Sequence, residues 1–216
     1  MKTTADFLSC KIPKGFLIAS LVIFVLLGAF LWFFSKGDSF ILLRGELNPV
    51  KNFIFKYITW LGDGITAVAL ALFFLFRKKW KAAAQIFGSY LLSGIVAQSF
   101  KKTMHMPRPA RFFEIYHQQI EAVDGVQLYM SFTSFPSGHS ATAFALAISL
   151  ILISPWWRKQ WWQAFVLAWI IGYSRIYLGQ HFPMDVYWGA LLGILSGLAV
   201  CPWLNQWKRL NRLTVN

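Results

Sequence analysis

Four short groups of polar residues stand where long apolar stretches begin or end, and they carry the residue types most able to do chemistry. The groups are Lys101 to Pro109, Pro136-Ser137-Gly138-His139, Ser174-Arg175 and His181 to Asp185. Ionisable residues beside membrane-length apolar stretches are costly to keep, so by default they mark function. Together the groups supply cations, helix starts and, besides His105, two histidines at those helix starts, which indicates a site for an anion.

A phosphate is the anion that this set suits best. The planar guanidinium of Arg pairs with phosphate oxygens, and the ammonium of Lys acts as a point charge. The N-terminus of a helix adds free N–H groups and a favourable dipole. Ser137 is typical of a helix N-cap, and Gly138 allows close approach to the backbone. Pro183 suits the first turn of a helix, so His181 stands just before a positive helix end.

The two histidines provide a route for moving the phosphoryl group. Imidazole can attack phosphorus when a carboxylate orients its other nitrogen. Asp185, four residues after His181, is the only acidic residue within the four groups. His139 is then free to protonate the departing alkoxide and later to act as base toward water. Since His181 must be neutral while His139 carries a proton, we expect a bell-shaped dependence of activity on pH.

At these positions the sequence resembles the three signature motifs of the type-2 phosphatidic acid phosphatase family, whose superfamily includes vanadium haloperoxidases and glucose-6-phosphatase. The first motif is Lys, six residues, then Arg-Pro, and the second is Pro-Ser-Gly-His. The third is Ser-Arg, five residues, His, three residues, then Asp. Residues 101–185 match every fixed position in order. The expected arrangement of spans extends the likeness over nearly the whole chain.

The resemblance implies a role for each matching residue. His181 would be the nucleophile, Asp185 would orient it, and His139 would be the general acid. The phosphate oxygens would be held by Lys101, Arg108, Ser137, Gly138 and Arg175. The family needs no metal, and we expect no cofactor. The chain has only eight Asp and Glu residues, which leaves few ligands for a two-metal site.

Composition indicates that these groups are positioned by membrane helices. The chain is 57% hydrophobic and 13% charged, whereas soluble domains carry roughly 25% charged residues. A spanning helix needs about 20 mostly apolar residues. We predict an all-α bundle of six transmembrane helices in a single domain, residues 1–216. The expected spans lie between Lys14 and Lys36 and at 57–76, 82–100, 138–157, 161–177 and 183–204.

Alternating span directions place all four polar groups on the same membrane face. The first apolar run is too long for a signal peptide and ends in bulky aromatic residues, so we expect a retained helix. With the N-terminus inside, the 21 Lys and Arg residues divide into twelve inside and nine outside. Basic residues favour the cytoplasmic side. We therefore expect both termini in the cytoplasm and the site facing outward, in a bacterial inner membrane.

The net charge of +13 raises the alternative of a nucleic-acid partner. Such binding needs a clustered basic face, whereas here the basic residues form short groups between apolar stretches. Anionic lipid headgroups explain these groups more simply. We expect a phosphorylated membrane lipid as partner, no nucleic acid and no obligate protein partner. Tryptophans beside the turn near residue 160 are expected to be interface anchors.

Several other residues receive a structural interpretation. Cys10 and Cys201 form no CxxC pair, so we expect two free thiols and no disulfide. Asp63 is expected to be structural. The remaining candidates are His105 and His117, expected on a loop or surface, and Lys102, expected to support the site electrostatically. The stretch 110–135 lies between two motifs, and Phe112, Phe113 and Tyr116 are hypothesised to line the substrate entrance.

Several functions remain open at this point. The first is a lipid phosphatase acting on undecaprenyl diphosphate, phosphatidylglycerol phosphate, phosphatidic acid or lipid A. A phosphotransferase would pass phosphate from the same intermediate to another lipid. A non-catalytic transporter or lipid scaffold is disfavoured because His139, Arg175, His181 and Asp185 are all present. A haloperoxidase is disfavoured by the six spans, since that chemistry belongs to soluble members of the superfamily.

Overall fold

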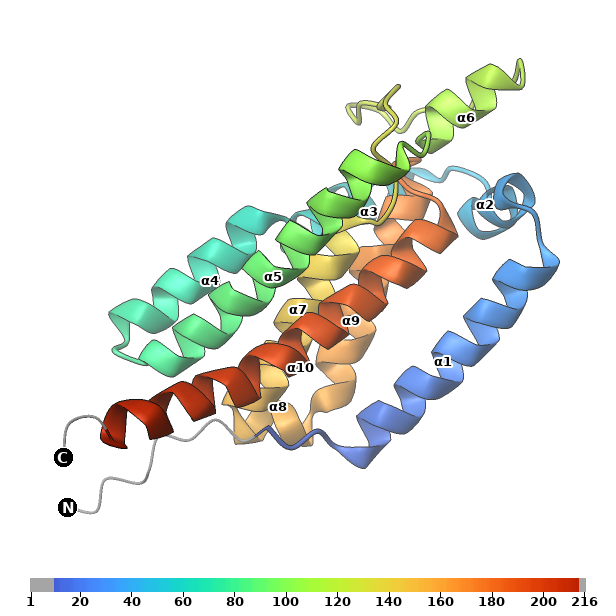
Figure 1. Ribbon diagram of the computed structural model, residues 1–216. Helices are drawn as coiled ribbons and strands as arrows, with labels where there is room; N and C mark the ends of the chain where they lie inside the picture. The colour runs from blue at the N-terminus through green and yellow to red at the C-terminus, as the bar shows by residue number, and fades with distance from the viewer. Residues whose placement is uncertain (1–9, 214–216) are drawn as a thin grey trace.

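The computed structural model describes residues 10–213, with side chains up to residue 206, and this part of the chain contains helices and no strand. The prediction of an all-α fold is confirmed. The elements in chain order are α1 (Lys14–Phe33), α2 (Lys36–Arg44), α3 (Pro49–Ile58), η1 (Thr59–Gly62), α4 (Gly64–Phe76), α5 (Trp80–Met104), α6 (Pro109–Ile115), α7 (Gly138–Ile153), α8 (Pro155–Lys159), α9 (Trp161–Tyr177) and α10 (Pro183–Leu213). Figure 1 shows α5, α7, α9 and α10 side by side, with α1 on the outside.

Helix α7 forms the centre of the bundle, and α5, α9 and α10 pack against it. Twelve of its 16 residues are buried. Three glycines spaced four apart on α10, Gly189, Gly193 and Gly197, bring the two backbones together. A Cβ added at Gly193 would lie only 2.3 Å from the carbonyl oxygen of Ala141. Small residues at this spacing are a common way for membrane helices to approach closely.

The number of membrane crossings stays a prediction, because only some helices have the length and composition for a crossing. Among the described residues these are α1 and residues Pro183–Gln206 of α10, while Pro49–Gly62 and Gly64–Phe76 make a further candidate if the bent pair is one span. Each of the six expected spans nevertheless contains a helix. Helices α7 and α9 have 16 and 17 residues, and α5 carries charged residues in its last turn.

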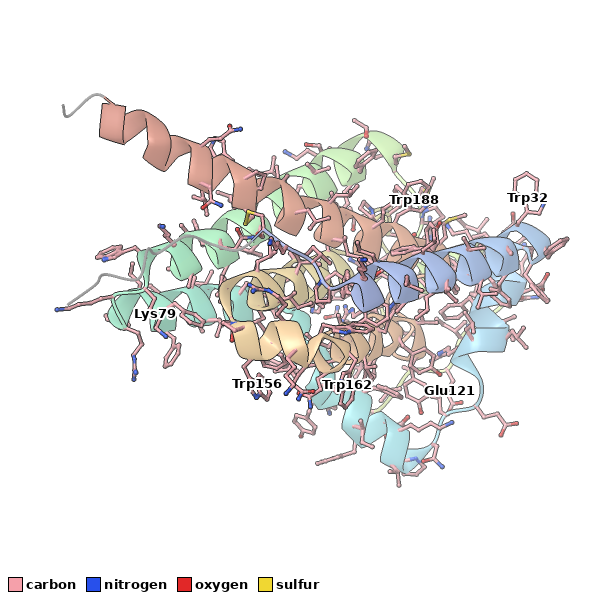
Figure 2. All side chains as sticks on the ribbon, turned by 90° about the horizontal axis from the view of Figure 1, so that it is seen from below. Trp32, Lys79, Glu121, Trp156, Trp162 and Trp188 are labelled. Atoms are coloured by element: carbon pink, nitrogen blue, oxygen red, sulfur yellow. A yellow bond between two sulfur atoms is a disulfide. The ribbon has the colours of Figure 1, made fainter. Side chains whose placement is uncertain are left out.

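The outer surface of the bundle is apolar in a way that suits lipid. Large hydrophobic side chains of α1 are exposed, among them Leu21 at 66% and Leu26 at 65%. Contiguous apolar surface of this kind marks contact with a membrane or a partner. Figure 2 shows Trp32, Trp156 and Trp162 at the periphery of the molecule, and each is more than half exposed.

The second expected span, 57–76, is not one continuous helix. Helix α3 ends at Ile58 and η1 follows. Asp63 then has an extended backbone, and the bend between Pro49–Gly62 and Gly64–Phe76 is 53°. The Asp63 side chain caps α4 by accepting a hydrogen bond of 2.8 Å from the N–H of Ile65. An Asp at an N-cap begins a new helix, which explains the break. The expected structural role of Asp63 is present.

The expectation of two free thiols is wrong, because Cys10 and Cys201 form a disulfide with a Cα–Cα separation of 5.8 Å. The bond joins the segment before α1 to the later part of α10. The two residues are 191 apart in sequence, so no short cysteine spacing in the sequence indicates that they pair. They meet because the beginning of α1 and the end of α10 lie at the same end of the bundle (Figure 1).

Candidate active site

His181 and Asp185 form a buried pair where α9 leads into α10. Their side chains are 2% and 1% exposed, and His181 Nδ1 lies 3.4 Å from Asp185 Oδ2. The same carboxylate oxygen accepts hydrogen bonds from the Phe182 N–H at 2.9 Å and from the Ser134 hydroxyl at 2.5 Å. The carboxylate is therefore fixed from three sides, and it orients the imidazole so that Nε2 is left for chemistry.

Burial keeps the His181 imidazole neutral. It lowers the pKa of His181 from 6.5 to about 3, and the positive charges of Arg108 and Arg175 act in the same direction. Asp185 partly opposes this effect, through its contact with the ring and its negative charge. A neutral imidazole oriented by a carboxylate is the form that can act as a nucleophile.

Three cations, Arg175, Arg108 and Lys101, reach the same region from separate elements, and within the described residues none of them makes an ion pair. Arg175, on α9, is 8% exposed, and its Nη1 donates a hydrogen bond of 2.8 Å to the Thr59 hydroxyl of η1. Arg108, just before α6, contacts the Gln180 side chain at 3.3 Å. The Nε atoms of both arginines are buried without a hydrogen-bond partner. Converging cations without carboxylate partners are suited to an anion.

The N-terminus of α7 completes this anion site. Ser137 is the N-cap, and its side-chain oxygen accepts from the Ser140 N–H at 3.4 Å. The Ser137 N–H donates to the Asp185 carbonyl at 2.9 Å, which joins the second motif to the third. The Lys101 ammonium would lie 3.8 Å from a Cβ placed on Gly138. The helix start therefore faces a cation across an opening that a glycine leaves clear.

Comparison with known proteins agrees with this arrangement. Residues 82–209 match the sequence model of the PAP2 superfamily. The chain belongs to the PAP2 superfamily. The undecaprenyl-diphosphatase of Sulfolobus acidocaldarius is 29% identical to it over 148 residues, covering 68% of this chain and 66% of the relative. The lipid A 4′-phosphatase of Porphyromonas gingivalis is 29% identical over 172 residues, covering 75% and 70%.

A solved structure supports the same assignment. The crystal structure of Aquifex aeolicus LpxE is 30% identical to this chain and superimposes with a TM-score of 0.59, covering 74% of this chain and 91% of the other. Membership of the PAP2 superfamily, together with relatives that are named as lipid phosphatases, makes this protein a membrane phosphatase. It confirms the resemblance seen in the motifs. The roles of individual site residues remain proposals.

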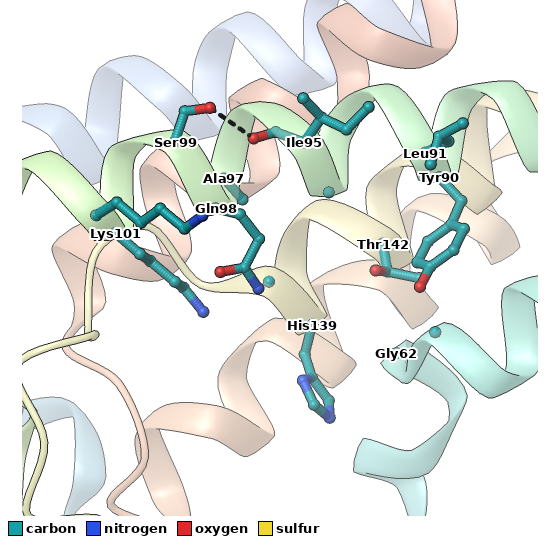
Figure 3. Close-up of a pocket in the computed structure, with 14 residues that line it drawn as sticks. Gly62, Tyr90, Leu91, Ile95, Ala97, Gln98, Ser99, Lys101, His139 and Thr142 are labelled. Atoms are coloured by element: carbon teal, nitrogen blue, oxygen red, sulfur yellow. Dashed lines mark hydrogen bonds between the residues drawn. The ribbon is translucent and has the colours of Figure 1, made fainter.

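The PAP2 site opens into a cavity of about 570 Å³ between α4, α5 and α7, whose lining includes Lys101, Gly138 and His139. Figure 3 shows the side chains of Lys101, Gln98 and His139 directed into this space. A second cavity of about 300 Å³, with Arg175, Tyr129 and Asp63 in its lining, also includes His139. His139 therefore lies between the two openings.

The segment between α6 and α7 folds back over the site. The Lys56 ammonium donates to the Asp124 carbonyl at 3.1 Å, and the Gln180 amide donates to the Gln127 carbonyl at 2.5 Å. Tyr129 lies with its ring 4.9 Å from the Arg108 guanidinium. From the stretch 110–135, Gly125, Val126, Gln127 and Tyr129 line the cavity that includes Arg175.

The aromatic residues expected to line the entrance are placed differently. Phe112 packs against Phe182 with ring centroids 5.3 Å apart, and Phe113 packs against Phe40 at 5.5 Å. Tyr116 is 62% exposed. Phe112 and Phe113 therefore belong to the packing around Phe182, the residue that follows His181. His105 and His117 are exposed, as expected.

Sequence reasoning missed three residues that hold the site together. Ser134 donates to Asp185, Thr59 accepts from Arg175, and Gln180 contacts Arg108. Ser134 stands two residues before the second motif and Gln180 one residue before His181, so proximity to the motifs was the available signal. Thr59 lies inside an expected apolar span, so nothing in the sequence indicated its contact with Arg175. Within the described residues we find no group of three His, Cys, Asp or Glu side chains placed to hold a metal ion.

Proposed function

We propose that this protein removes a phosphate from a membrane lipid, as a phosphomonoester or a diphosphate, through a phosphohistidine on His181. The observation that carries the proposal is the buried, neutral His181 beside Asp185, with cations nearby that lack carboxylate partners. Relatives named for dephosphorylating undecaprenyl diphosphate and lipid A support a lipid as substrate. Phosphatidylglycerol phosphate and phosphatidic acid are further candidates of the same chemical class.

In the first step the phosphate binds with its oxygens facing Lys101, Arg108, Arg175 and the start of α7 at Ser137 and Gly138. The His181 Nε2 atom attacks phosphorus, and the bond from phosphorus to the lipid oxygen breaks. His139 gives a proton to the departing oxygen. The cations and the helix N-terminus stabilise the charge that develops on the phosphoryl oxygens, and Asp185 stabilises the positive charge that forms on the His181 ring.

In the second step water attacks the phosphorus of the phosphohistidine. His139, which has lost its proton in the first step, accepts one from this water. The bond between phosphorus and His181 Nε2 breaks, and inorganic phosphate leaves. His139 is then protonated and His181 neutral, so the site has returned to its starting state without a metal or cofactor in either step.

The proposed location is a bacterial inner membrane with the site on the outer side. The residues of the site lie at one end of the bundle, where α5 ends and α7 and α10 begin, and the start of α1 and the end of α10 lie at the other end (Figure 1). The distribution of basic residues favours the termini in the cytoplasm. The large cavity between α4 and α5 is lined in part by apolar side chains such as Leu91 and Ile95, which suits entry of a lipid substrate.

The test is phosphate release by the purified protein in detergent with EDTA present, against the four candidate lipids. His181→Ala should abolish release, whereas His105→Ala removes an exposed imidazole at a variable position of the first motif and should not. Enzyme quenched during turnover with an alkaline denaturant should carry phosphate on a histidine, because the P–N bond survives base and is hydrolysed by acid. Release that survives in His181→Ala contradicts the proposed intermediate, and transfer of phosphate to an added acceptor lipid would assign a phosphotransferase.

A further inference from the structure

Asp63 lies beside His139 although it belongs to none of the three motifs. Its Oδ2 atom is 3.7 Å from His139 Nε2, and the two side chains are 39% and 27% exposed. The other carboxylate oxygen, Oδ1, accepts the N–H of Ile65 and so caps α4. One carboxylate therefore has two contacts, and the cap fixes the direction from which the second oxygen approaches the imidazole.

The turn that carries Asp63 is packed directly against the site. A Cβ added at Gly62 would lie 3.0 Å from the His139 carbonyl oxygen and 2.6 Å from Cγ2 of Ile171. Thr59, four residues earlier, accepts a hydrogen bond from Arg175. The segment 59–63 thus touches both the second and the third motif, and it has little freedom to move away from His139.

The electrostatic surroundings of His139 make a carboxylate valuable here. Arg175, Lys101 and Arg108 all bring positive charge to its vicinity, and His181 is also close. Like charges disfavour the protonated imidazole that a general acid needs, whereas a carboxylate favours it. Within the described residues, Asp63 is the carboxylate that contacts His139. The arrangement parallels the pairing of His181 with Asp185 on the other side of the site.

We propose that Asp63 is the positioning residue for His139, orienting its ring and favouring the proton that passes to the departing lipid oxygen. This inference rests on the proposed function, because it assigns His139 the role of general acid. Asp63 itself contacts neither the phosphate nor the reacting atoms. The site would then use two histidine–carboxylate pairs, one for attack and one for departure, and only the first is encoded in the motifs.

Asp63→Asn separates this role from helix capping. Asn caps a helix about as well as Asp, so the variant keeps the α4 cap and removes the charge. The substrates compared are a short-chain phosphatidic acid, whose alkoxide must be protonated to leave, and p-nitrophenyl phosphate, whose phenolate leaves unprotonated. The measured quantity is kcat/KM, which reports the steps up to departure of the leaving group. His139→Ala is measured alongside as the reference.

General acid catalysis contributes typically 10²–10⁴-fold. We expect Asp63→Asn to lower kcat/KM for the phosphatidic acid by about 10- to 100-fold and for p-nitrophenyl phosphate by less than about threefold, with an unchanged melting temperature. The role of Asp63 would be refuted if Asp63→Asn lowered kcat/KM equally for both substrates, or for neither, while His139→Ala lowered it mainly for the phosphatidic acid. If His139→Ala also lowers kcat/KM equally for the two substrates, His139 is not the general acid and this inference is wrong as well. The role of His181 as nucleophile is tested separately, because it depends on the loss of all release in His181→Ala.

Asp63→Ala serves as the second variant. It removes both the charge and the cap, and loss of a cap costs about 1 kcal/mol. If Asp63 were only a cap, Asp63→Ala would lower the melting temperature and Asp63→Asn would behave like the original protein on both substrates. That result would refute the proposal.

Discussion

The close contact between α10 and α7 gives a sharp test of how the site is built. In Gly193→Ala the new Cβ would lie 2.3 Å from the Ala141 carbonyl oxygen and 2.9 Å from the Ala145 N–H. These atoms belong to the backbone of α7 and cannot rotate aside. Since a carbon–oxygen contact needs roughly 3.4 Å, the two helices must separate by about 1 Å.

The consequence of that separation can be estimated from what the helices carry. Helix α10 begins two residues after His181 and holds Asp185, whereas α7 begins at Gly138 and holds His139. A misplacement of about 1 Å between reacting groups costs on the order of 10²-fold in rate. Overpacking of this kind also destabilises by about 1–3 kcal/mol. We expect Gly193→Ala to lower kcat by about 100-fold and to lower the melting temperature.

The matched control is Gly28→Ala on α1. It is the same substitution within a helix and also faces α10, but its Cβ would meet the Tyr187 hydroxyl at 3.4 Å, an ordinary contact. We expect phosphate release within about twofold of the original protein. The assay is phosphate release with the preferred lipid, with thermal unfolding in the same detergent. Full activity in Gly193→Ala, or equal loss in both variants, would refute the view that this helix contact sets the site.

Three further results are expected. Ser134→Ala removes one hydrogen bond to Asp185 and should lower kcat by about tenfold with little change in KM, since a hydrogen bond to a charged group contributes about 1.5–3 kcal/mol. Because burial lowers the pKa of His181 to about 3, kcat/KM should show no acid limb near pH 6.5. Thermal stability should fall as the pH drops from about 6.5 toward 3, because in this range His181 is protonated in the unfolded chain and still neutral in the folded protein. Reduction of the Cys10–Cys201 disulfide in the purified protein should lower its melting temperature, because the loss of a disulfide costs up to about 5 kcal/mol of stability; an unchanged melting temperature would contradict this.

The site could be predicted from sequence largely because its members lie at helix ends. Residues such as His139 and Asp185 are polar interruptions of apolar runs, so they stand out in the sequence, and their common membrane face is a prediction from the expected spans. The distances do not follow. That Asp185 Oδ2 reaches His181 Nδ1 depends on the turn at Phe182, and that Ser137 bonds the Asp185 carbonyl depends on the glycines of α10.

The errors have physical causes of their own. The break at Asp63 was missed because hydropathy averages over a window, whereas one capping side chain is enough to end a helix and begin another. The disulfide was missed because Cys10 and Cys201 are brought together only by the packing of α1 against α10. The aromatic residues at 112–116 look like a substrate surface in sequence, yet Phe112 and Phe113 are taken up by packing against Phe182 and Phe40.

These observations explain why residues outside the motifs matter for the same chemistry. In the proposed mechanism the motifs supply the catalytic and phosphate-binding groups, and several of them are held by residues from elsewhere: Arg175 by Thr59, Asp185 by Ser134, and His139 by the turn at Gly62 and Asp63. Such contacts come from η1 and the loop before α7, which connect the long helices. The catalytic geometry therefore depends on the irregular segments as much as on the helices that cross the apolar layer.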